Sequence, residues 1–269
     1  MKYFVMILMF FIATTAFAQK EVKACSWNIK DFGVSKSAKE IDFIASVLKG
    51  FDVIAIQEVV AGPGGAQAVA ILNDALNTKG EKWDYSISNP TFSSSYKAER
   101  YAFVWKTAYI KKKGDAWLEN KYKVEIDREP YFATFIVEQK EFTLVNFHAI
   151  TKSKQPETEI KYFKYMPEEY GALNLIFIGD FNCPQSHTVF NPLKAMGYRP
   201  ALTNQKTSLR HQCINDDCLA SEFDNIFYNT KSIIATQSGI VPFYTSFSTL
   251  EEANTISDHV PIFLKFTLN

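Results

Sequence analysis

The sequence predicts an α/β fold in which two β-sheets pack together and helices cover their outer faces. Strand-like runs alternate with helical patterns in the first half of the chain, and strand-like runs follow one another in pairs in the second half. Sheets and amphipathic helices bury their apolar faces against one another, so this order favours a layered sandwich. Polar residues that end the strands would then converge on one edge of the sandwich.

Residues 19–269 are expected to form one domain. The chain of 269 residues is 47% hydrophobic, which is enough to bury a large core, and no linker, repeat or low-complexity run divides it. Basic and acidic residues number 29 each, so the overall charge does not indicate a nucleic-acid partner. Non-specific binding of polyanions depends on lysine and arginine, and a phosphodiester substrate would therefore have to be held locally.

Residues 1–18 are expected to be a secretory signal peptide. Lys2 precedes an apolar stretch over Phe4–Ile12, and the small-residue pattern Ala16-Phe17-Ala18 precedes Gln19. The apolar stretch is too short to span a bilayer, and no other stretch approaches the required length. The mature protein should be soluble and either secreted or periplasmic.

The four cysteines suit an exported protein, in which disulfides persist. Three full pairings are possible, and the spacing alone does not choose among them. We expect one bridge, between Cys213 and Cys218, with Cys25 buried in the first strand as a small apolar residue. A zinc site is the weaker alternative, because neither a CxxC spacing nor a nearby histidine pair is present.

The first half begins with an alternating strand over Val22–Trp27 that ends at Asn28. Apolar residues at helical spacing predict a helix over Ala38–Leu48. The apolar run Phe51–Ile56 predicts a second buried strand, which ends in Gln57-Glu58. Two successive strands therefore each end in polar side chains.

A glycine-rich turn, Ala61–Gly65, then opens a helix through Leu76. The turn lacks the Walker lysine and the spacing of a dinucleotide fingerprint, so a structural helix start is favoured over a phosphate cradle. A polar loop is expected over Thr91–Glu99. Further strands are expected over Tyr85–Ser88, Arg100–Trp105, Tyr109–Lys111, Tyr131–Val137 and Phe142–Phe147, the last ending at His148.

A buried strand in the second half, through Leu173–Phe177, leads into Ile178-Gly179-Asp180-Phe181-Asn182. Asp180 and Asn182 stand two positions apart, so both side chains can point the same way from the strand end. Helices are expected over Glu157–Tyr165 and Val189–Met196, and a polar loop over Thr203–Ala220. The remaining strands are expected over Ile226–Tyr228, Ser238–Val241 and Val260–Phe266.

The polar residues at the strand ends carry the functional prediction. Oxygen ligands without cysteine indicate a hard divalent ion, and a histidine oriented by a carboxylate can act as a general acid or base near neutral pH. A metal, an acid and a base together suit hydrolysis of a phosphate ester. Each residue taken alone can be explained by a structural role. That explanation is much weaker when nine such residues all stand at strand ends. These residues are Asn28, Glu58, Glu99, His148, Asp180, Asn182, Asp224, Asp258 and His259.

An ordered set of motifs resembles the endonuclease/exonuclease/phosphatase superfamily and spans almost the whole mature chain. The motifs are Ser26-Trp27-Asn28, Ile56-Gln57-Glu58, Asn146-Phe147-His148, Gly179-Asp180-Phe181-Asn182, Phe223-Asp224-Asn225 and Ser257-Asp258-His259. Residues 95–101 and Arg128-Glu129-Pro130 are similar to the secreted deoxyribonuclease I branch. The resemblance implies a four-layered α/β sandwich, with two packed, mostly antiparallel β-sheets flanked by helices.

The resemblance also implies roles for individual residues. Glu58 would ligate a catalytic metal with Asn28 and, depending on the state, Asp180 or Asp258. Asn182 would hydrogen-bond the scissile phosphate. The pairs His259 with Asp224 and His148 with Glu99 would activate water and handle the leaving oxygen, with acid and base left unassigned. The expected substrate-binding residues are Arg128, Arg100, Tyr96 and Thr207.

The chain departs from the deoxyribonuclease I pattern at three places. Val60 stands where that branch has an arginine that enters the minor groove, which puts such an insertion in doubt. Ala98 is an extra residue close to Tyr96. Cys183 and Cys218 do not fall at the offsets of that branch's disulfide.

We therefore predict a secreted, divalent-metal-dependent endonuclease that hydrolyses DNA with little sequence specificity. Mg²⁺ or Mn²⁺ is the expected cofactor, with Ca²⁺ as a further candidate. The expected protein is a monomer without a membrane span, and its expected partner is the backbone of double-stranded DNA, with single-stranded DNA as a further candidate.

Two alternatives remain open at this point. One is a phosphatase or sphingomyelinase-type phosphodiesterase of the same superfamily. A lipid substrate would require an exposed apolar hairpin, for which Phe243, Tyr244 and Phe247 are candidates, although core packing explains them equally well. The other alternative is a non-catalytic pseudoenzyme that binds nucleic acid or protein, and the presence of both histidines and all the carboxylates argues against it.

Overall fold

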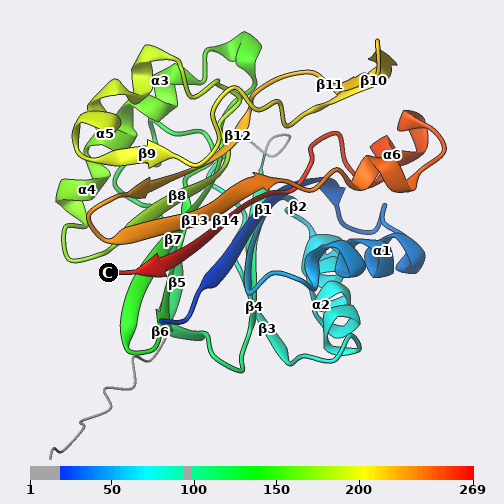
Figure 1. Cartoon of the computed structure of the whole chain (residues 1–269), viewed down its shortest axis with the longest axis horizontal. Helices are drawn as coiled ribbons and strands as arrows, with labels where there is room; N and C mark the ends of the chain where they lie inside the picture. The colour runs from blue at the N-terminus through cyan, green and yellow to red at the C-terminus, as the bar shows by residue number, and fades with distance from the viewer. Residues whose placement is uncertain (1–18, 94–97) are drawn as a thin grey trace, which may run out of the picture.

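The computed structural model describes residues 19–93 and 98–269, and it contains two six-stranded β-sheets packed face to face with helices outside them (Figure 1). In the described residues, β1 with β2 and β7 with β8 are parallel neighbours, and the other pairs within the two sheets are antiparallel. The predicted fold class, a sandwich of two mostly antiparallel sheets flanked by helices, is confirmed. The predicted signal peptide and Tyr96 lie outside the described residues.

The first sheet has the strand order β13-β14-β1-β2-β4-β3. Its strands are β13 (Ile233–Ile240), β14 (Ile262–Leu268), β1 (Val22–Phe32), β2 (Val53–Val60), β4 (Glu99–Lys106) and β3 (Trp83–Ile87). The second sheet has the order β5-β6-β7-β8-β12-β9. Its strands are β5 (Lys111–Leu118), β6 (Tyr131–Val137), β7 (Lys140–His148), β8 (Leu175–Asp180), β12 (Asp224–Asn229) and β9 (Tyr198–Pro200).

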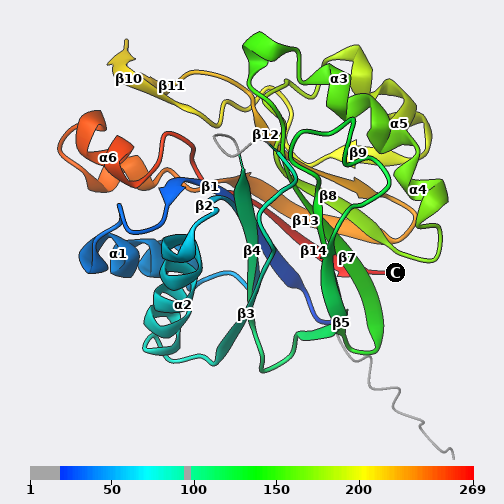
Figure 2. The same cartoon turned by 180° about the vertical axis from the view of Figure 1, so that it is seen from behind.

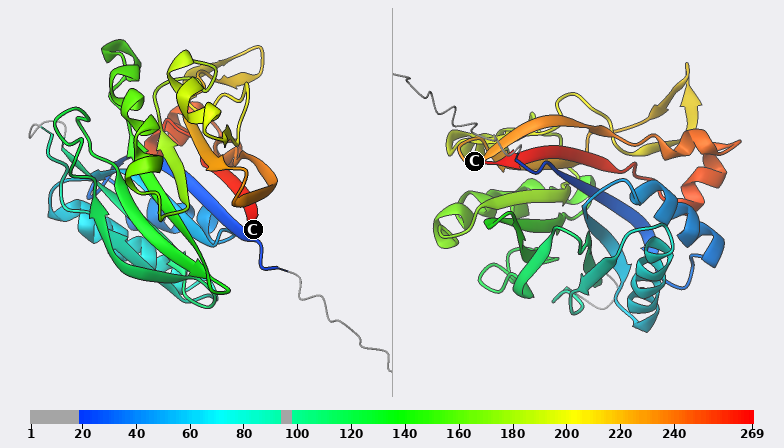
Figure 3. Two further views of the ribbon diagram at one scale, coloured as in Figure 1. Left: turned by 90° about the vertical axis from the view of Figure 1, so that its left-hand side faces the viewer. Right: turned by 60° about the horizontal axis from the view of Figure 1, so that its bottom comes forward.

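Helices α1 (Ala38–Leu48) and α2 (Pro63–Asn77) lie on one side of the molecule, and the shorter helices between β7 and β9 lie on the other (Figures 1 and 2). The latter are η1 (Lys152–Lys154), α3 (Glu157–Ile160), η2 (Lys161–Lys164), α4 (Met166–Glu169), η3 (Thr188–Phe190) and α5 (Asn191–Ala195). Segment η4 (Phe243–Ser246) and α6 (Leu250–Ile256) precede the last strand. Figure 3 shows the stacked arrangement from two further directions.

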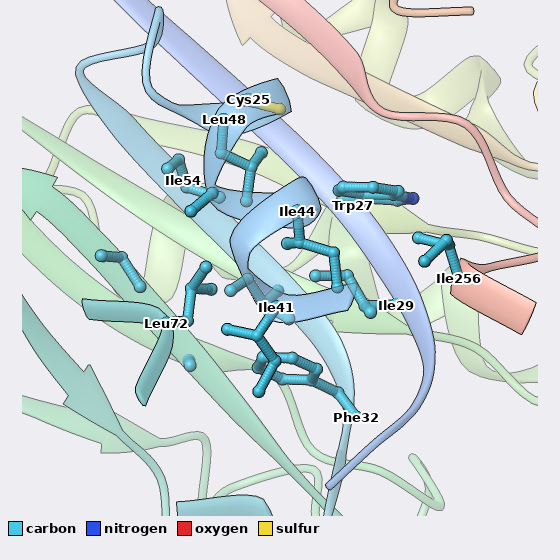
Figure 4. Close-up of a cluster of buried hydrophobic side chains, with 14 of the residues drawn as sticks. Cys25, Trp27, Ile29, Phe32, Ile41, Ile44, Leu48, Ile54, Leu72 and Ile256 are labelled. Carbon is cyan, nitrogen blue, oxygen red and sulfur yellow. The ribbon is translucent and has the colours of Figure 1, made fainter. Parts of the chain in front are cut away.

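Three apolar clusters fill the three interfaces between these four layers. Along β2, Val53 and Ala55 face the second sheet, whereas Ile54 and Ile56 face α1 and α2. This alternation follows from the two-residue period of a strand and explains why β2 is apolar on both faces. The cluster under α1 contains Trp27 and Ile44 (Figure 4). A third cluster, on the outer face of the second sheet, includes Phe163, Phe177 and Phe181.

Local sequence signals explain where several elements begin and end. Ser37 accepts a hydrogen bond from the backbone of Glu40, whose side chain accepts one from the backbone of Ser37, and this capping box starts α1 at the predicted residue. The bounds predicted for α1 and for β6 agree with the structure. The strand predicted over Tyr109–Lys111 is instead β5 (Lys111–Leu118), which carries three lysines at the edge of its sheet. Charged edge strands of this kind resist pairing with other chains.

The polar loop predicted over Thr203–Ala220 is wrong, because it contains a β-hairpin that projects from the sandwich (Figure 1). Its strands are β10 (Leu209–Ile214) and β11 (Asp217–Leu219). Asn215 and Asp216 form the turn with positive φ values of 50° and 63°, as a two-residue hairpin turn requires. The predicted disulfide between Cys213 and Cys218 is present and joins the two strands, and Cys25 is buried as predicted.

No helix within residues 19–93 and 98–269 has the length and apolar character needed to cross a membrane.

Gly179 allows the two central strands of the second sheet to approach each other. Its φ is +145°, and a Cβ at this position would lie 2.0 Å from the backbone oxygen of Phe147 on β7. Side chains cannot be accommodated at such a distance, and the backbone conformation also disfavours them. The glycine therefore places the end of β8, and with it Asp180, directly beside His148.

We expect Gly179→Ala to destabilise the protein by about 3 kcal/mol or more, because the added methyl group collides with the backbone of β7. Gly80→Ala should cost about 1 kcal/mol, since Gly80 has a φ of +98° but open space around it. Gly50→Ala, with open space and no positive φ, should stay within about 0.5 kcal/mol. Urea unfolding of the three variants measures these differences. A Gly179 variant no less stable than the Gly80 variant would contradict the proposed close approach.

Candidate functional site

The strand register places the predicted site residues at one end of the sandwich. On the second sheet, Asp180 at the end of β8 pairs with His148 at the end of β7 and with Asp224 at the start of β12. On the first sheet, Asn28 of β1 pairs with Gln57 of β2. Parallel neighbours end at the same edge of a sheet, so both sheets deliver polar residues to a common edge.

Two histidine–carboxylate pairs lie at this edge. Nδ1 of His148 is 3.0 and 2.9 Å from Oε1 and Oε2 of Glu99, and Nδ1 of His259 is 2.7 Å from Oδ2 of Asp224. All four residues are buried, with 3 to 8% of their surface exposed. Each carboxylate orients its imidazole by accepting a hydrogen bond from Nδ1, which leaves Nε2 free to exchange a proton with another molecule.

The free nitrogen atoms of both histidines face the same carboxylate. Oδ2 of Asp180 lies 3.5 Å from Nε2 of His148 and 3.6 Å from Nε2 of His259. Oδ1 of Asp180 accepts a hydrogen bond of 2.9 Å from the backbone N–H of Asn182. Asp180 therefore lies between the two imidazoles and stabilises positive charge on either of them.

The electrostatic environment shifts the pKa of His148, His259 and Asp180. Burial disfavours protonation of His148 and His259, but the adjacent Glu99 and Asp224 carboxylates outweigh it, and the pKa of both histidines is raised. Asp180 raises the pKa of both histidines, and the shift is larger for His259, which also feels Asp258, whereas Arg128 opposes protonation of His148. Burial alone would raise the pKa of Asp180, but the two neighbouring imidazoles and its hydrogen bonds lower it below the usual range. Asp180 is therefore held as a carboxylate.

Asn28 and Glu58 form a second part of the site, where a cation would fit. Nδ2 of Asn28 donates to Oε1 of Glu58 at 3.0 Å and to Oδ2 of Asp180 at 3.1 Å. Its Oδ1 is buried and has no hydrogen-bond partner among the described residues. A buried carbonyl oxygen without a partner is unfavourable, and a hard cation prefers oxygen ligands of this kind. The donor set of Asn28, Glu58 and Asp180 therefore suits the predicted divalent ion.

The backbone is distorted at Glu58 so that its side chain reaches the site. The residue has a φ of +59°, and the pairing of β2 with β4 shifts register between Ile56 and Val59. Such bulges redirect a side chain at the end of a strand, and non-glycine residues with positive φ are concentrated at functional sites. Asn182, with a φ of +48°, shows the same feature beside Asp180.

Asp180, Asp224 and His259 also lie close enough to hold an ion together. However, Oδ2 of Asp224 already accepts hydrogen bonds from His259 and from Thr207, the latter at 2.6 Å. Asp224 is thus already paired with His259 and Thr207, whereas the metal-ligand role of Asp180 beside Asn28 and Glu58 stays a prediction. In the described part of the chain, no hydrogen bond or ion pair joins the carboxylate of Asp258 to Asn28, Glu58 or Asp180, and its role as a metal ligand stays a prediction.

The structure gives internal hydrogen bonds to the predicted substrate-binding residues that it describes. Arg128 donates to the backbone oxygens of His148 and Ala149 and, at 3.4 Å, to Glu99. Arg100 donates to the backbone oxygens of Ala61 and Ser88, both at 2.8 Å.

Thr207 is fully buried, and its hydroxyl donates to Asp224. Asn182 is nearly buried and donates from Nδ2 to the oxygen of Ala149 at 3.1 Å. The geometry thus makes Thr207 a support for Asp224. Direct contact of these four residues with a substrate stays a prediction.

Several supporting residues were not singled out from the sequence. The hydroxyl of Ser257 donates to the backbone oxygen of Asn28 at 2.6 Å and accepts from the backbone N–H of His259 at 3.0 Å, which links the two parts of the site. Nε1 of Trp27 donates to the backbone oxygen of His259 at 2.7 Å. Ser257 and Trp27 belong to the motifs that contain His259 and Asn28. Their position next to these site residues in the sequence is the signal that could have identified them.

A cleft with a volume of about 520 Å³ opens beside His148 and Glu58. Its wall includes Val60, Arg128, Thr151 and Lys154. Its carboxylates outnumber its two cations, Arg128 and Lys154, so a phosphate group beside His148 would need the positive charge of a bound metal ion as well.

Comparisons with known proteins agree with this geometry. The chain matches the family described as Endonuclease/Exonuclease/phosphatase family over residues 25–259. It is 26% identical to a protein named deoxyribonuclease from a Thioalkalivibrio strain, with 99% of this chain and 76% of the relative covered. It is also 26% identical to human deoxyribonuclease gamma, with 91% and 85% covered. The structure of a mannosyl-6-phosphatase from Bacteroides thetaiotaomicron has the same fold, with a TM-score of 0.66, 17% identity and coverage of 91% and 99%.

The pKa of each histidine should depend on its own carboxylate. Asp224→Asn should lower the pKa of His259 more than that of His148, and Glu99→Gln should do the reverse, because each change removes the negative charge that favours the imidazolium. The measurement is an NMR titration of the imidazole protons in EDTA. Equal pKa shifts of both histidines in both variants would show that each carboxylate acts on both imidazoles and not mainly on its own.

Proposed function

Because the chain belongs to the endonuclease/exonuclease/phosphatase family, we propose that it is an exported, divalent-metal-dependent endonuclease that hydrolyses DNA with little sequence specificity. The observation that carries the proposal is the arrangement of two histidine–carboxylate pairs that face Asp180 from either side. The relatives named as deoxyribonucleases support DNA as the substrate. The small-residue pattern before Gln19 supports export.

In the proposed reaction, water attacks phosphorus and the bond to the leaving oxygen breaks. One imidazole takes a proton from the attacking water at its Nε2, and the other delivers a proton to the leaving oxygen from its Nε2. Glu99 and Asp224 hold the two rings in position and stabilise their charged forms. The geometry is nearly symmetric about Asp180, so either histidine can take either role.

Glu58 and Asn28, with Asp180 or Asp258, would hold Mg²⁺ or Mn²⁺, with Ca²⁺ as a further candidate. A bound divalent ion would neutralise charge on the phosphate as a Lewis acid. Asn182 would donate to a phosphate oxygen and Arg128 would balance its negative charge.

Low sequence specificity follows from the same residues. Contacts with phosphate position DNA without reading its sequence, whereas reading requires side chains in a groove. Val60, which is 38% exposed, occupies the cleft wall where a longer cationic side chain would reach a groove. The phosphate backbone of the DNA is therefore the proposed point of contact, and one copy of the chain suffices to make this contact.

A phosphatase or sphingomyelinase-type activity is the alternative within the family, since the same groups could hydrolyse a small phosphate ester. The apolar segment considered for lipid binding offers little support for the lipid case. Phe243 is only 3% exposed and packs against Trp27, and Phe247 packs against Phe43. Relaxation of supercoiled plasmid, run beside assays with sphingomyelin, sugar phosphates and inositol phosphates, distinguishes these functions. Activity on an ester with intact plasmid would refute the proposed nuclease.

We expect His148→Ala and His259→Ala each to reduce plasmid nicking at least about a hundredfold, because each removes a general acid or base. His211→Ala, which changes an exposed histidine on the β10–β11 hairpin, should retain activity. The readout is the rate of conversion of supercoiled to open-circular plasmid. Nicking that survives both active-site substitutions would exclude the proposed proton transfers.

Removal of the unpaired oxygen at Asn28 should weaken metal binding. We expect EDTA to abolish nicking and Asn28→Ala to weaken Mg²⁺ or Mn²⁺ binding about tenfold or more, as measured by calorimetry and by the metal dependence of nicking. Asn73→Ala is the matched control, because Oδ1 of Asn73 on α2 is also buried without a hydrogen-bond partner among the described residues. Equal ion affinity in the Asn28 and Asn73 variants would show that Asn28 is not a metal ligand.

A further inference from the structure

Four aromatic rings, each with a lysine ammonium over its face, form a surface strip that the proposed reaction does not use. Phe92 pairs with Lys123, and three tyrosines pair with the lysines next to them in the chain, at distances of 4.8 to 5.7 Å from nitrogen to ring centre. We call this group the aromatic–lysine strip. Its members are Phe92, Lys121, Tyr122, Lys123, Lys161, Tyr162, Lys164 and Tyr165.

The strip is continuous. The rings of Tyr122, Tyr162 and Tyr165 lie 5.4, 6.3 and 6.4 Å from one another, and Lys123, next to Tyr122 in the chain, reaches over Phe92. Tyr162 belongs to η2 and Tyr165 directly follows it. This segment connects α3 and α4, which Figure 2 labels. Segments far apart in the sequence therefore build one surface of alternating rings and ammonium groups.

One end of the strip adjoins the cleft. The backbone N–H of Phe92 donates to both carboxylate oxygens of Glu129, at 3.0 and 2.9 Å, and Glu129 directly follows Arg128 of the cleft wall. The residue before Phe92, Thr91, pairs through its backbone N–H with the oxygen of Glu99 at 2.8 Å. A polymer whose phosphate occupies the cleft could continue directly onto Phe92.

Buried carboxylates fix the loop that carries Lys121, Tyr122 and Lys123. Glu119 is 1% exposed and accepts hydrogen bonds from the backbone of Lys121 and Tyr122 and from the hydroxyl of Tyr170. Glu159 is 2% exposed and accepts from the backbone of Asp127 and Ile150. Neither belongs to the proposed catalytic groups, and together they hold the strip in a fixed position relative to the cleft. Such preorganisation lowers the entropic cost of binding.

The accessible rings and charges define the partner. Phe92 is 66% exposed and Tyr165 is 45% exposed, whereas Tyr122 and Tyr162 are partly buried against the outer core. Lys121 is paired with Glu169, but Lys123, Lys161 and Lys164 form no ion pair within the described residues. These three lysines can contact phosphates while the exposed rings stack on bases.

We infer that the aromatic–lysine strip binds single-stranded DNA that leads out of the cleft. This inference rests on the proposed endonuclease function and extends the substrate of the enzyme to unpaired strands. Only an unpaired strand presents base faces to surface rings and phosphates to the neighbouring ammonium groups at once. A paired duplex keeps its base faces stacked inside. Exposed carboxylates on the same segments, at Glu125 and Glu168, keep the interaction weak and dependent on salt.

The test measures fluorescence anisotropy with the full chain carrying His148→Ala, so that the oligonucleotide stays intact in Mg²⁺. The probes are labelled oligothymidylate of about 20 nucleotides and a blunt duplex of about 20 base pairs. Phe92→Ala with Tyr165→Ala removes the exposed rings, and Lys161→Gln with Lys164→Gln removes two charges. Ile71→Ala with Lys39→Gln is the matched control on α1 and α2, where Ile71 is 48% exposed.

We expect the ring variant to bind oligothymidylate about tenfold or more weakly. The parent is the chain that carries His148→Ala alone. For its binding of oligothymidylate, the slope of log K against log salt should be about −2, and in the lysine variant the slope should be shallower by about 1. The control should match the parent with both probes, and the ring variant should bind the blunt duplex as the parent does, because a duplex keeps its base faces stacked inside.

Unchanged affinity of the ring variant for oligothymidylate, or equal weakening in the control variant, would overturn the inference. If the chain with His148 intact fails to nick plasmid while the ring variant still loses affinity for oligothymidylate, the endonuclease is refuted and the binding surface is supported. Circular dichroism of each variant confirms that the changes in affinity come from a folded protein.

Discussion

The site depends on one buried carboxylate, Asp180, held between two imidazoles. Removing a carboxylate from water is costly unless opposite charge and hydrogen-bond donors replace the lost solvent. Here both histidines, the amide of Asn28 and the backbone N–H of Asn182 supply that replacement. Because each partner also has its own role in the proposed reaction, folding stability and activity depend on the same few contacts.

The surrounding structure keeps those contacts in register. Gly179 lets β8 approach β7 closely, and the left-handed backbone at Glu58 and Asn182 brings the Glu58 side chain to Asn28 and the Asn182 N–H to Asp180. These conformations are unfavourable locally, and the packed sheets on either side maintain them. Ser257 adds a direct link between the backbones of Asn28 and His259, which couples the proposed metal-binding residues to the proposed proton-transfer pair.

The sequence predicted the strands that bury both faces, because their apolar runs and polar ends are local features. It also predicted that His148 and Asp180 end β7 and β8, whereas β1 and β2 continue past Asn28 and Glu58 to Phe32 and Val60. The β10–β11 hairpin was missed because its turn, Asn215 and Asp216, lies within a polar segment without apolar alternation. Helix α6 spans only seven residues, too few to show a helical period. The internal bonds of Arg128 and Thr207 could not be predicted, since their partners lie far away in the sequence.

The absence of net charge constrains how the proposed enzyme holds DNA. A strongly basic surface would bind DNA everywhere and release product slowly, whereas a chain whose 29 basic residues are balanced by 29 acidic ones depends on the cations held close to the cleft. Arg128 donates to the backbone oxygen of His148, so its charge is fixed beside the imidazole that is proposed to act on the phosphate. Binding energy is then concentrated at the scissile phosphate, where it contributes most to catalysis, and flanking contacts can stay weak. Weak flanking contacts also allow the same site to act along a backbone without regard to its sequence.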